Sequence, residues 1–280
     1  MNYIIQNHTA LIFTDLDATF LDKDNFSFAN NVDIANKLVS SGNYVIFNTS
    51  KTFAEIIHFF EKHSISFPFI CENGAAIYLP PGIIDSQKNK RAQFEILFES
   101  KRIDSSIRNF KKILKKRFGP NIIFFNDLSH SEQVKLSGLE DDNLKLAVKR
   151  EYSELILFNS IGSKQIDELY NFVKFHNFQL IKGGRFFHLS YDCNKGFAMQ
   201  VLVNTFKKYY SNREFITIAL GDNENDIGML NQANYPCLIS GGDDKLISKK
   251  INSENLIISK QTAPEGWIEC INNTFKMIRG

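Results

Sequence analysis

Acidic side chains follow the first apolar run of the chain. In the stretch LIFTDLDATFLD, Asp15 and Asp17 stand one residue apart and come directly after apolar residues. The run predicts a buried strand, and open parallel sheets bind ligands at the carboxyl ends of their strands. Because a buried carboxylate is costly without a partner, we expect a cation or a proton beside this pair. Turn or helix capping would explain the two aspartates as well if they stood alone.

A second predicted strand, at 43–48, also ends in polar residues. Thr49, Ser50 and Lys51 follow it, just before a predicted helix at 52–63. A helix N-terminus with hydroxyl groups and a cation is suited to bind an anion. Simple N-capping by Thr49 or Ser50 is the alternative, although it does not need the lysine.

A third predicted strand, at 215–220, runs into the sequence GDNENDIGML. Asp222 and Asp226 lie there about one helical turn apart. Helix capping would explain Asp226 more easily than Asp222. Carboxylates gathered at one sheet edge need a cation, and hard oxygen ligands suit Mg²⁺. Lys195, at the start of another predicted helix, is the candidate cation for a phosphate group, although alone it would be interpreted as a surface lysine.

The order of elements predicts a parallel sheet with crossover helices, because short apolar runs alternate with amphipathic stretches. The strands predicted for this sheet are 10–14, 43–48, 67–71 and 215–220, and the helices include 31–41, 52–63 and 195–210. Further strands and helices fall in the middle of the chain, where Gly183-Gly184 predicts a tight hairpin. We therefore expect an α/β fold with a Rossmann-like core of residues 1–81 and 191–280. An α+β domain inserted at 82–190 would leave a ligand-binding cleft between the two.

Composition and charge exclude several function classes. The 280 residues carry a formal net charge of +2, so no global field indicates nucleic-acid or membrane binding. The basic stretch 111–117 is typical of the solvated face of an amphipathic helix. The four cysteines are far apart, which predicts free thiols in a reducing compartment. Because neither a signal peptide nor a run of about 20 apolar residues is evident, we expect a cytoplasmic protein.

The motifs DLDAT, NTSK, NKG and GDNEND, in this order, resemble the four motifs of the haloacid dehalogenase superfamily of phosphatases. The middle block looks like the C2 cap of the sugar-phosphatase branch of that superfamily. SKT at 50–52, CENGAAIY at 71–78, KREYSE at 149–154, GGRFFHL at 183–189 and PEGW at 264–267 are similar to the mannosyl-3-phosphoglycerate phosphatase family. Related members of that family act on the glucosyl analogue. One departure is Ala18, where the superfamily usually has glycine.

The resemblance implies roles for the residues of these motifs. Asp15 would be the nucleophile that forms an aspartyl-phosphate, and Asp17 would act as acid and then as base. Thr49 and Lys195 would hold the phosphoryl oxygens. The expected cofactor is Mg²⁺, held by the Asp15 carboxylate, the Asp17 backbone carbonyl and Asp222, with Asp226 in or near the coordination shell.

The substrate implied by the resemblance carries a phosphate, a carboxylate and a sugar. An arginine fork such as Arg185 suits a carboxylate, although an exposed charge on an edge strand would explain it too. For Arg150 a helix-end ion pair with Glu154 is the local alternative. The residues expected to bind substrate are Ser50, Lys51, Glu72, Asn73, Gly74, Arg150, Arg185, His188 and Asn225.

Two other functions stay open from the sequence. The same chemistry could serve sucrose 6-phosphate, a hexose phosphate or a sugar-phosphate mutase reaction, because a fold does not determine its substrate. A non-catalytic sugar-phosphate sensor is the alternative from another class, although all the expected catalytic residues are present. In each case we expect a small-molecule ligand, no nucleic acid, no membrane, and a monomer or homodimer.

Overall fold

The computed structural model describes residues 3–84, 89–159 and 162–279, and the chain forms two compact units. The first unit comprises Met1–Ser50, Ser66–Glu99 and Asn194–Gly280, and the second comprises Lys51–Ile65 and Ser100–Cys193. These bounds differ from the predicted domains in three places, at residues 51–65, between residues 82 and 99, and at residues 191–193. Residues 94–99 pair with the large sheet of the first unit, and residues 51–65 group with the second. The domain boundaries given above stay a prediction.

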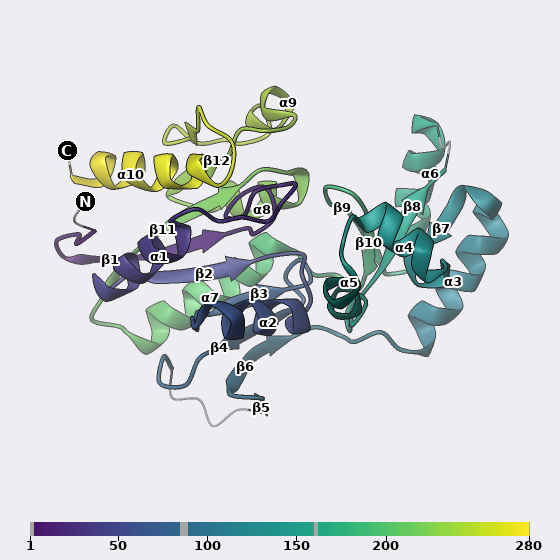
Figure 1. The fold of residues 1–280 in the computed structure, drawn as a ribbon, viewed down its shortest axis with the longest axis horizontal. Coiled ribbons are helices and arrows are strands. Elements are labelled where there is room, and N and C mark those ends of the chain that lie inside the picture. The colour runs from purple at the N-terminus through teal and green to yellow at the C-terminus, as the bar shows by residue number, and fades with distance from the viewer. Residues whose placement is uncertain (1–2, 85–88, 160–161, 280) are drawn as a thin grey trace. The chain divides into compact units, whose positions relative to one another are not determined.

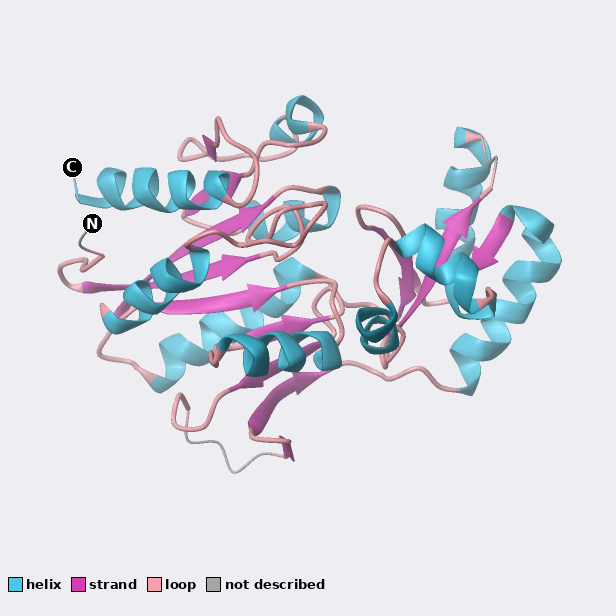
Figure 2. Cartoon of the chain, in the orientation of Figure 1, coloured by secondary structure: helices cyan, strands magenta, loops and turns pink. Residues whose placement is uncertain are grey.

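The first unit is built on a nine-stranded sheet with the order β13-β12-β11-β1-β2-β3-β4-β6-β5 (Figures 1 and 2). Six strands are parallel: β1 (His8–Thr14), β2 (Tyr44–Asn48), β3 (Phe69–Cys71), β11 (Glu214–Gly221), β12 (Tyr235–Leu238) and β13 (Ile257–Ile258). The sheet continues with three antiparallel strands: β4 (Ala76–Leu79), β5 (Lys90–Arg91) and β6 (Phe94–Glu99). The parallel order confirms the sheet that the alternating pattern predicted.

Helices of the first unit pack on the two faces of this sheet. They are α1 (Asn31–Ser40), α7 (Lys195–Tyr209), α8 (Ile227–Leu230), α9 (Asp244–Ser248), α10 (Glu265–Arg279) and the short 3-10 helix η3 (Glu224–Asp226). Leu11, Phe13 and Ile46 pack in one cluster with side chains of α7 and α8. The neighbouring residue Phe47 instead contacts Phe20, whose ring meets an aromatic ring of α10. This alternation follows from the period of two along a strand.

The second unit contains a four-stranded antiparallel sheet with the order β7-β8-β10-β9. Its strands are β7 (Ile122–Phe124), β8 (Ser153–Phe158), β9 (Gln179–Lys182) and β10 (Phe187–Ser190). Its helices are α2 (Phe53–His63), α3 (Ser105–Phe118), α4 (His130–Ser137), α5 (Asp141–Ala147), α6 (Ser163–Phe175), and the 3-10 turns η1 (Gly119–Asn121) and η2 (Phe125–Asp127). Residues of α3 and α6 form its main apolar core together with residues of the sheet.

Most predicted elements are present with shifts of one or two residues at their ends. The hairpin predicted at Gly183-Gly184 is present, but its turn is longer than two residues. Strand β10 begins only at Phe187, and the Gly183 N–H donates to the Phe186 carbonyl at 2.9 Å. Strand β4 was not predicted, since an apolar run of only four residues cannot be assigned to a strand by its pattern alone.

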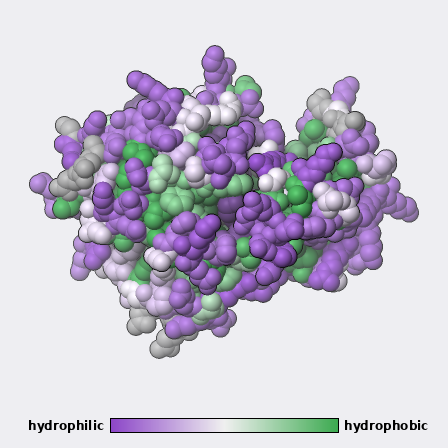
Figure 3. Space-filling view, in the orientation of Figure 1, coloured by the Kyte–Doolittle hydropathy of each residue, from purple (hydrophilic) through white to green (hydrophobic). Residues whose placement is uncertain are grey.

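One face of the molecule and the helices can be assessed for apolar character. On the face shown in Figure 3, hydrophilic residues predominate, with hydrophobic residues exposed between them. Among the helices in the described ranges, we find none with both the length and the apolar character required to cross a bilayer. All four cysteines are buried and free, as predicted.

Candidate active site

The register of two neighbouring strands brings the first acidic residues together. In the parallel pair of β1 and β11, Thr14 lies opposite Leu220, so both strands end at the same edge of the sheet. Asp15 follows β1 directly, and its N–H donates to the Leu220 carbonyl at 3.0 Å. Asp222 follows β11 in the same way. The parallel pairing therefore places the two carboxylates side by side, as the sequence predicted.

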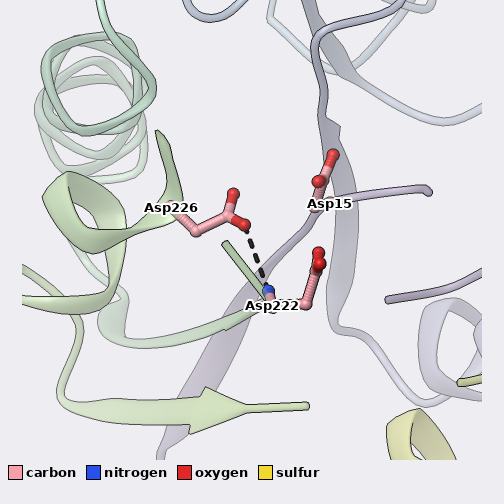
Figure 4. Close-up of side chains that lie close together, drawn as sticks. All are labelled: Asp15, Asp222 and Asp226. Carbon is pink, nitrogen blue, oxygen red and sulfur yellow. Dashed lines mark hydrogen bonds between the residues drawn. The ribbon is translucent and has the colours of Figure 1, made fainter. Parts of the chain in front are cut away.

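A third carboxylate completes this cluster (Figure 4). Asp15, Asp222 and Asp226 each offer a carboxylate oxygen, and the three oxygens lie within 4.8 Å of one another. Asp226 is fully buried, and its Oδ2 accepts the backbone N–H groups of Asp222 at 3.1 Å and Asn223 at 3.0 Å. A side chain at Gly221 would place its Cβ 2.5 Å from Asp226, so only glycine permits this close approach.

Lys195 supplies the one positive charge that contacts this cluster within the described residues. It is the first residue of α7, its side chain is fully buried, and its Nζ lies 2.9 Å from Asp15 Oδ1 and 2.6 Å from Asp226 Oδ1. Burial favours a low pKa for Lys195, but the carboxylates of Asp15 and Asp226 outweigh burial and hold the pKa above its usual value. The lysine is therefore charged at neutral pH.

The carboxylates are short of positive charge. Burial raises the pKa of Asp15 to about 7, although Lys195 acts in the opposite direction. Burial likewise raises the pKa of Asp222 well above its usual range, with further contributions from Asp226 and Asp15. Three carboxylates share one ammonium group, so ionisation of all three leaves an excess of negative charge next to the sheet.

This donor set fits a divalent metal ion. All its atoms are hard oxygens, the type that Mg²⁺ prefers, and Thr19 Oγ1 orients one of them by donating to Asp222 Oδ1 at 3.0 Å. Asp15 and Asp222 are the better ligands, because both oxygens of Asp226 already have partners within the protein. The Asp17 carboxylate is not part of the cluster. The ligand that the resemblance assigns to this residue is its backbone carbonyl, which stays a prediction.

A strained loop after β3 lies against two of the predicted motifs. Glu72, Asn73 and Gly74 have φ values of 45°, 60° and 98°, all in the left-handed region. The Asn73 N–H donates to the Thr49 carbonyl at 2.9 Å, and a Cβ on Gly74 would lie 2.2 Å from the Asn194 carbonyl oxygen. The close packing requires glycine there and places the loop beside the residue that precedes Lys195.

The loop also presents amide groups for a ligand. Asn225 Nδ2 donates to Asn73 Oδ1 at 3.0 Å, which connects the loop to the GDNEND motif. Asn73 is buried, and neither its Nδ2 nor the Oδ1 of Asn225 has a hydrogen-bond partner among the described residues. Since buried polar groups are normally paired, these two atoms are suited to bind polar ligand atoms. Ser50 and the buried Glu72, both predicted to bind substrate, belong to the same unit.

The other residues predicted to bind substrate lie in the second unit. Arg150 Nε donates to Ser153 Oγ at 2.9 Å, and its Nη2 lies 3.4 Å from Nδ1 of the buried His188. Arg185 lies in the turn before β10, and its Nη1 donates to the Ser137 carbonyl at the end of α4. Lys51 Nζ lies 3.7 Å from Glu55 Oε1. Arg150 and His188 thus form one cluster, and Arg185 makes a separate contact.

Comparisons with known proteins identify the family of this chain. The sequence profile of the haloacid dehalogenase-like hydrolases matches residues 12–252, a range that contains every residue of the acidic cluster. The protein belongs to the haloacid dehalogenase-like hydrolase family. The predicted family, α/β fold class and enzyme class, a phosphoric monoester hydrolase, are confirmed by this match and by the relatives described next.

Curated relatives of this hydrolase are similar over most of its length. A glucosyl-3-phosphoglycerate/mannosyl-3-phosphoglycerate phosphatase of Persephonella marina is 33% identical over 270 residues, which cover 93% of this chain and 95% of the relative. A mannosyl-3-phosphoglycerate phosphatase of Pyrococcus furiosus is 30% identical, with coverage of 82% and 90%. A solved phosphatase structure from Bacteroides thetaiotaomicron, of the same superfamily, has a TM-score of 0.66 at 14% identity, with coverage of 97% and 96%. This last similarity concerns the fold.

Several residues near the site have roles that the sequence did not predict. Asn48 Nδ2 donates to the Lys195 carbonyl at 3.1 Å, and Asn194 Oδ1 caps α7 by accepting the Phe197 N–H at 2.8 Å. The NTSK and NKG motifs contain these two residues, but nothing in their spacing indicates that one supports the other. The buried tryptophan of the PEGW motif is a further case, described below.

Proposed function

We propose that this hydrolase is a Mg²⁺-dependent phosphatase that converts mannosyl-3-phosphoglycerate, glucosyl-3-phosphoglycerate or both to the glycosylglycerate and phosphate. The observation that carries the proposal is the ion pair of Asp15 with Lys195 beside Asp222, at the end of β1. A nucleophilic carboxylate, a cation for phosphoryl oxygens and a metal-binding pair of carboxylates are the parts that phosphoryl transfer needs. The names of the curated relatives support the choice of substrate.

In the proposed reaction, an Asp15 carboxylate oxygen attacks phosphorus, and the bond between phosphorus and the phosphoglycerate oxygen breaks. Asp17 protonates the departing oxygen, which would otherwise leave as a poor alkoxide. Asp17 then takes a proton from a water molecule that attacks the aspartyl-phosphate, so phosphate leaves and the Asp15 carboxylate is restored. This division of one displacement into two steps is the advantage of a covalent intermediate.

The buried charges of the site would support both steps. Asp15 must be ionised to attack, and Lys195 at 2.9 Å favours that state. Mg²⁺, held by Asp15, Asp222 and the Asp17 carbonyl, would neutralise charge between the carboxylate and the phosphoryl group. Thr49 and Lys195 would hold phosphoryl oxygens, and the amide N–H groups of Asn73 would donate to the same group or to a neighbouring hydroxyl.

The carboxylate of the substrate requires a cation of its own. Arg150 is the better candidate in the second unit, since it is half-buried and held by Ser153, whereas Arg185 is exposed and donates to a helix end. A guanidinium group presents its donors in a planar fork that matches a carboxylate. His188 beside Arg150 would contribute to the same recognition.

A substrate panel tests the proposal. Phosphate release with Mg²⁺ is measured for mannosyl- and glucosyl-3-phosphoglycerate, sucrose 6-phosphate, mannose 6-phosphate and 3-phosphoglycerate. We expect turnover of the two glycosyl-phosphoglycerates, which Asp15→Asn lowers at least about 10⁴-fold. Asp33→Asn, on the exposed face of α1, is the matched control and should retain activity.

The pattern of turnover distinguishes the alternatives. Asp15-dependent release from another sugar phosphate alone would retain the phosphatase chemistry and refute the proposed substrate. Binding of a glycosyl-phosphoglycerate without Asp15-dependent release from any compound would favour a sensor.

A further inference from the structure

A chain of two buried hydrogen bonds joins the last helix to the predicted nucleophile. Trp267 Nε1 of α10 lies 3.0 Å from Thr14 Oγ1, and Thr14 Oγ1 lies 2.8 Å from the backbone carbonyl oxygen of Asp15. Both Trp267 and Thr14 have no exposed surface. The two bonds therefore cannot be replaced by bonds to bulk water without opening the core.

The chemistry of the three groups determines the direction of both bonds. An indole N–H can only donate and a carbonyl oxygen can only accept. The Thr14 hydroxyl must therefore accept from Trp267 and donate to Asp15. A hydroxyl that accepts one bond becomes a stronger donor in the next, so the indole strengthens the bond to Asp15.

These bonds hold the Asp15 carbonyl at the point where the pairing of β1 ends. Strand β1 ends at Thr14, and the Asp15 N–H still pairs with the Leu220 carbonyl of β11 at 3.0 Å. The Asp15 carbonyl is instead held by the Thr14 hydroxyl. Beyond it the chain turns sharply, with three N–H groups directed at the Leu16 carbonyl and Ala18 in the left-handed region at φ 57°.

The donor at the far end of the chain of bonds is itself held firmly. The Trp267 ring meets the Phe20 ring edge to face, with centroids 5.0 Å apart. A Cβ on Gly266 would lie 2.3 Å from the Gln261 carbonyl oxygen, so the start of α10 packs too closely for any other residue. The indole N–H is consequently a preorganised donor.

We propose that Trp267 is a positioning residue, which acts through Thr14 to hold the Asp15 peptide in the orientation that aims its carboxylate at phosphorus. The PEGW motif thereby gains a function in the reaction, although the indole touches no reacting atom. The inference rests on the proposed function in that Asp15 is taken as the nucleophile. The alternative is that the two bonds merely satisfy buried polar groups, which would affect stability alone.

Matched variants separate positioning from stability. Thr14→Val keeps the shape of the side chain and removes the hydroxyl, Thr14→Ser restores it, and Trp267→Phe removes the N–H but keeps an aromatic ring next to Phe20. Thr274→Val is the control, since Thr274 is a fully buried threonine of the same helix whose hydroxyl pairs with Cys237 Sγ at 3.3 Å, away from Asp15.

The kinetic measurement compares kcat, KM and Tm of these variants with the best phosphate ester. We expect Thr14→Val and Trp267→Phe to lower kcat roughly 10- to 100-fold with little change in KM, because small misplacements of a nucleophile are costly. Thr14→Ser should recover most of kcat, and Thr274→Val should lower Tm without lowering kcat. Full kcat in both Thr14→Val and Trp267→Phe, or an equal loss of kcat in Thr274→Val, would overturn the proposal.

A second measurement does not need turnover. Trp267 is the single tryptophan of the chain, so the indole emission of the protein comes from this residue alone. Mg²⁺ with beryllium fluoride, a mimic of an aspartyl-phosphate, should change that emission in the wild type and in Thr14→Ser. The change should be absent in Asp15→Asn and reduced in Thr14→Val.

The two measurements also separate this inference from the proposed function. If no phosphate ester is hydrolysed but the emission change still requires Asp15 and Thr14, the proposed function fails and the positioning role stands. If phosphate esters are hydrolysed but Thr14→Val retains both full kcat and the full emission change, the positioning role fails and the proposed function stands.

Discussion

Lys195 in the first unit and Lys111 in the second each contact two carboxylates, but the two clusters differ in burial. The Lys195 side chain is fully buried, and its partners Asp15 and Asp226 have exposed fractions of 9% and 0%. Lys111 lies 2.8 Å from Asp127 and 3.7 Å from Glu154, and the Asp127 side chain is 37% exposed. Water therefore screens the pair of Lys111 with Asp127 and hardly reaches the Lys195 cluster.

The difference appears in the pKa values of the carboxylates. Burial raises the pKa of Asp15 to about 7 even though Lys195 opposes it. Burial also acts upward on Asp127, but hydrogen bonds from Lys111 and Lys115 outweigh it and hold the pKa of Asp127 below its usual value. The cluster of the second unit has enough positive charge, whereas that of the first needs more. A site that is incomplete without a cation is suited to catalysis, and a complete one serves the structure.

The largest difference between the two clusters is expected in stability and activity when the lysine of each is replaced. Lys195→Met leaves buried carboxylates without a cation, which should cost about 3–5 kcal/mol in the free energy of unfolding and about 10²–10³-fold in kcat. Lys111→Met removes a partly exposed pair and should cost about 1 kcal/mol or less, with kcat unchanged. Chemical denaturation and phosphate release measure the two quantities.

Equal destabilisation by the two substitutions would contradict the comparison. It would mean that water reaches the Lys195 cluster as readily as the Lys111 cluster.

A smaller effect is expected when pH and Mg²⁺ are varied together. In the metal-free protein Asp15 has a pKa of about 7, whereas an unfolded aspartate titrates at about 4. Between these values the folded state holds a proton that the unfolded state has lost, so the free energy of unfolding falls as pH rises. Since Mg²⁺ binds ionised carboxylates, the increase in Tm that Mg²⁺ causes should grow from about pH 5 to about pH 8.

Calorimetry in Mg²⁺ and in a chelator measures this increase at each pH. Asp222→Asn should reduce the effect of Mg²⁺, and Asp127→Asn in the second unit should leave it unchanged. A Mg²⁺ effect that is constant across pH, or that depends on Asp127, would place the metal elsewhere.

The smallest effect is expected from the arginine cluster of the second unit. Arg150→Lys keeps the charge but loses the planar fork, so we expect KM for a glycosyl-phosphoglycerate to rise about 10-fold with kcat nearly unchanged. The control is Arg102→Lys, since Arg102 pairs with Glu151 at 2.8 Å and its side chain is 51% exposed. Steady-state kinetics measures KM for both variants. If Arg150→Lys and Arg102→Lys have the same KM, Arg150 does not contribute to substrate recognition.

The sequence by itself determined the order of elements and the place of the acidic motifs. Short apolar runs are a local property, so they predicted β1, β2 and β11 to within a few residues. The geometry of parallel sheets then required Asp15 and Asp222 to meet at one edge, as they do. Strand β4 was not predicted, because its apolar run is only four residues long and follows the short strand β3 after a brief turn.

Only the tertiary structure decided which groups support the acidic cluster. Trp267 and Thr14 are 253 residues apart in the chain, and Asn48 reaches Lys195 across 147 residues. Residue spacing in the sequence predicts neither contact, since each depends on how α10 and α7 pack against the sheet. The raised pKa of Asp15 is likewise a consequence of burial, which depends on all the elements that exclude water from the end of β1. Chemistry that follows from a strand end could be predicted, and chemistry that follows from packing could not.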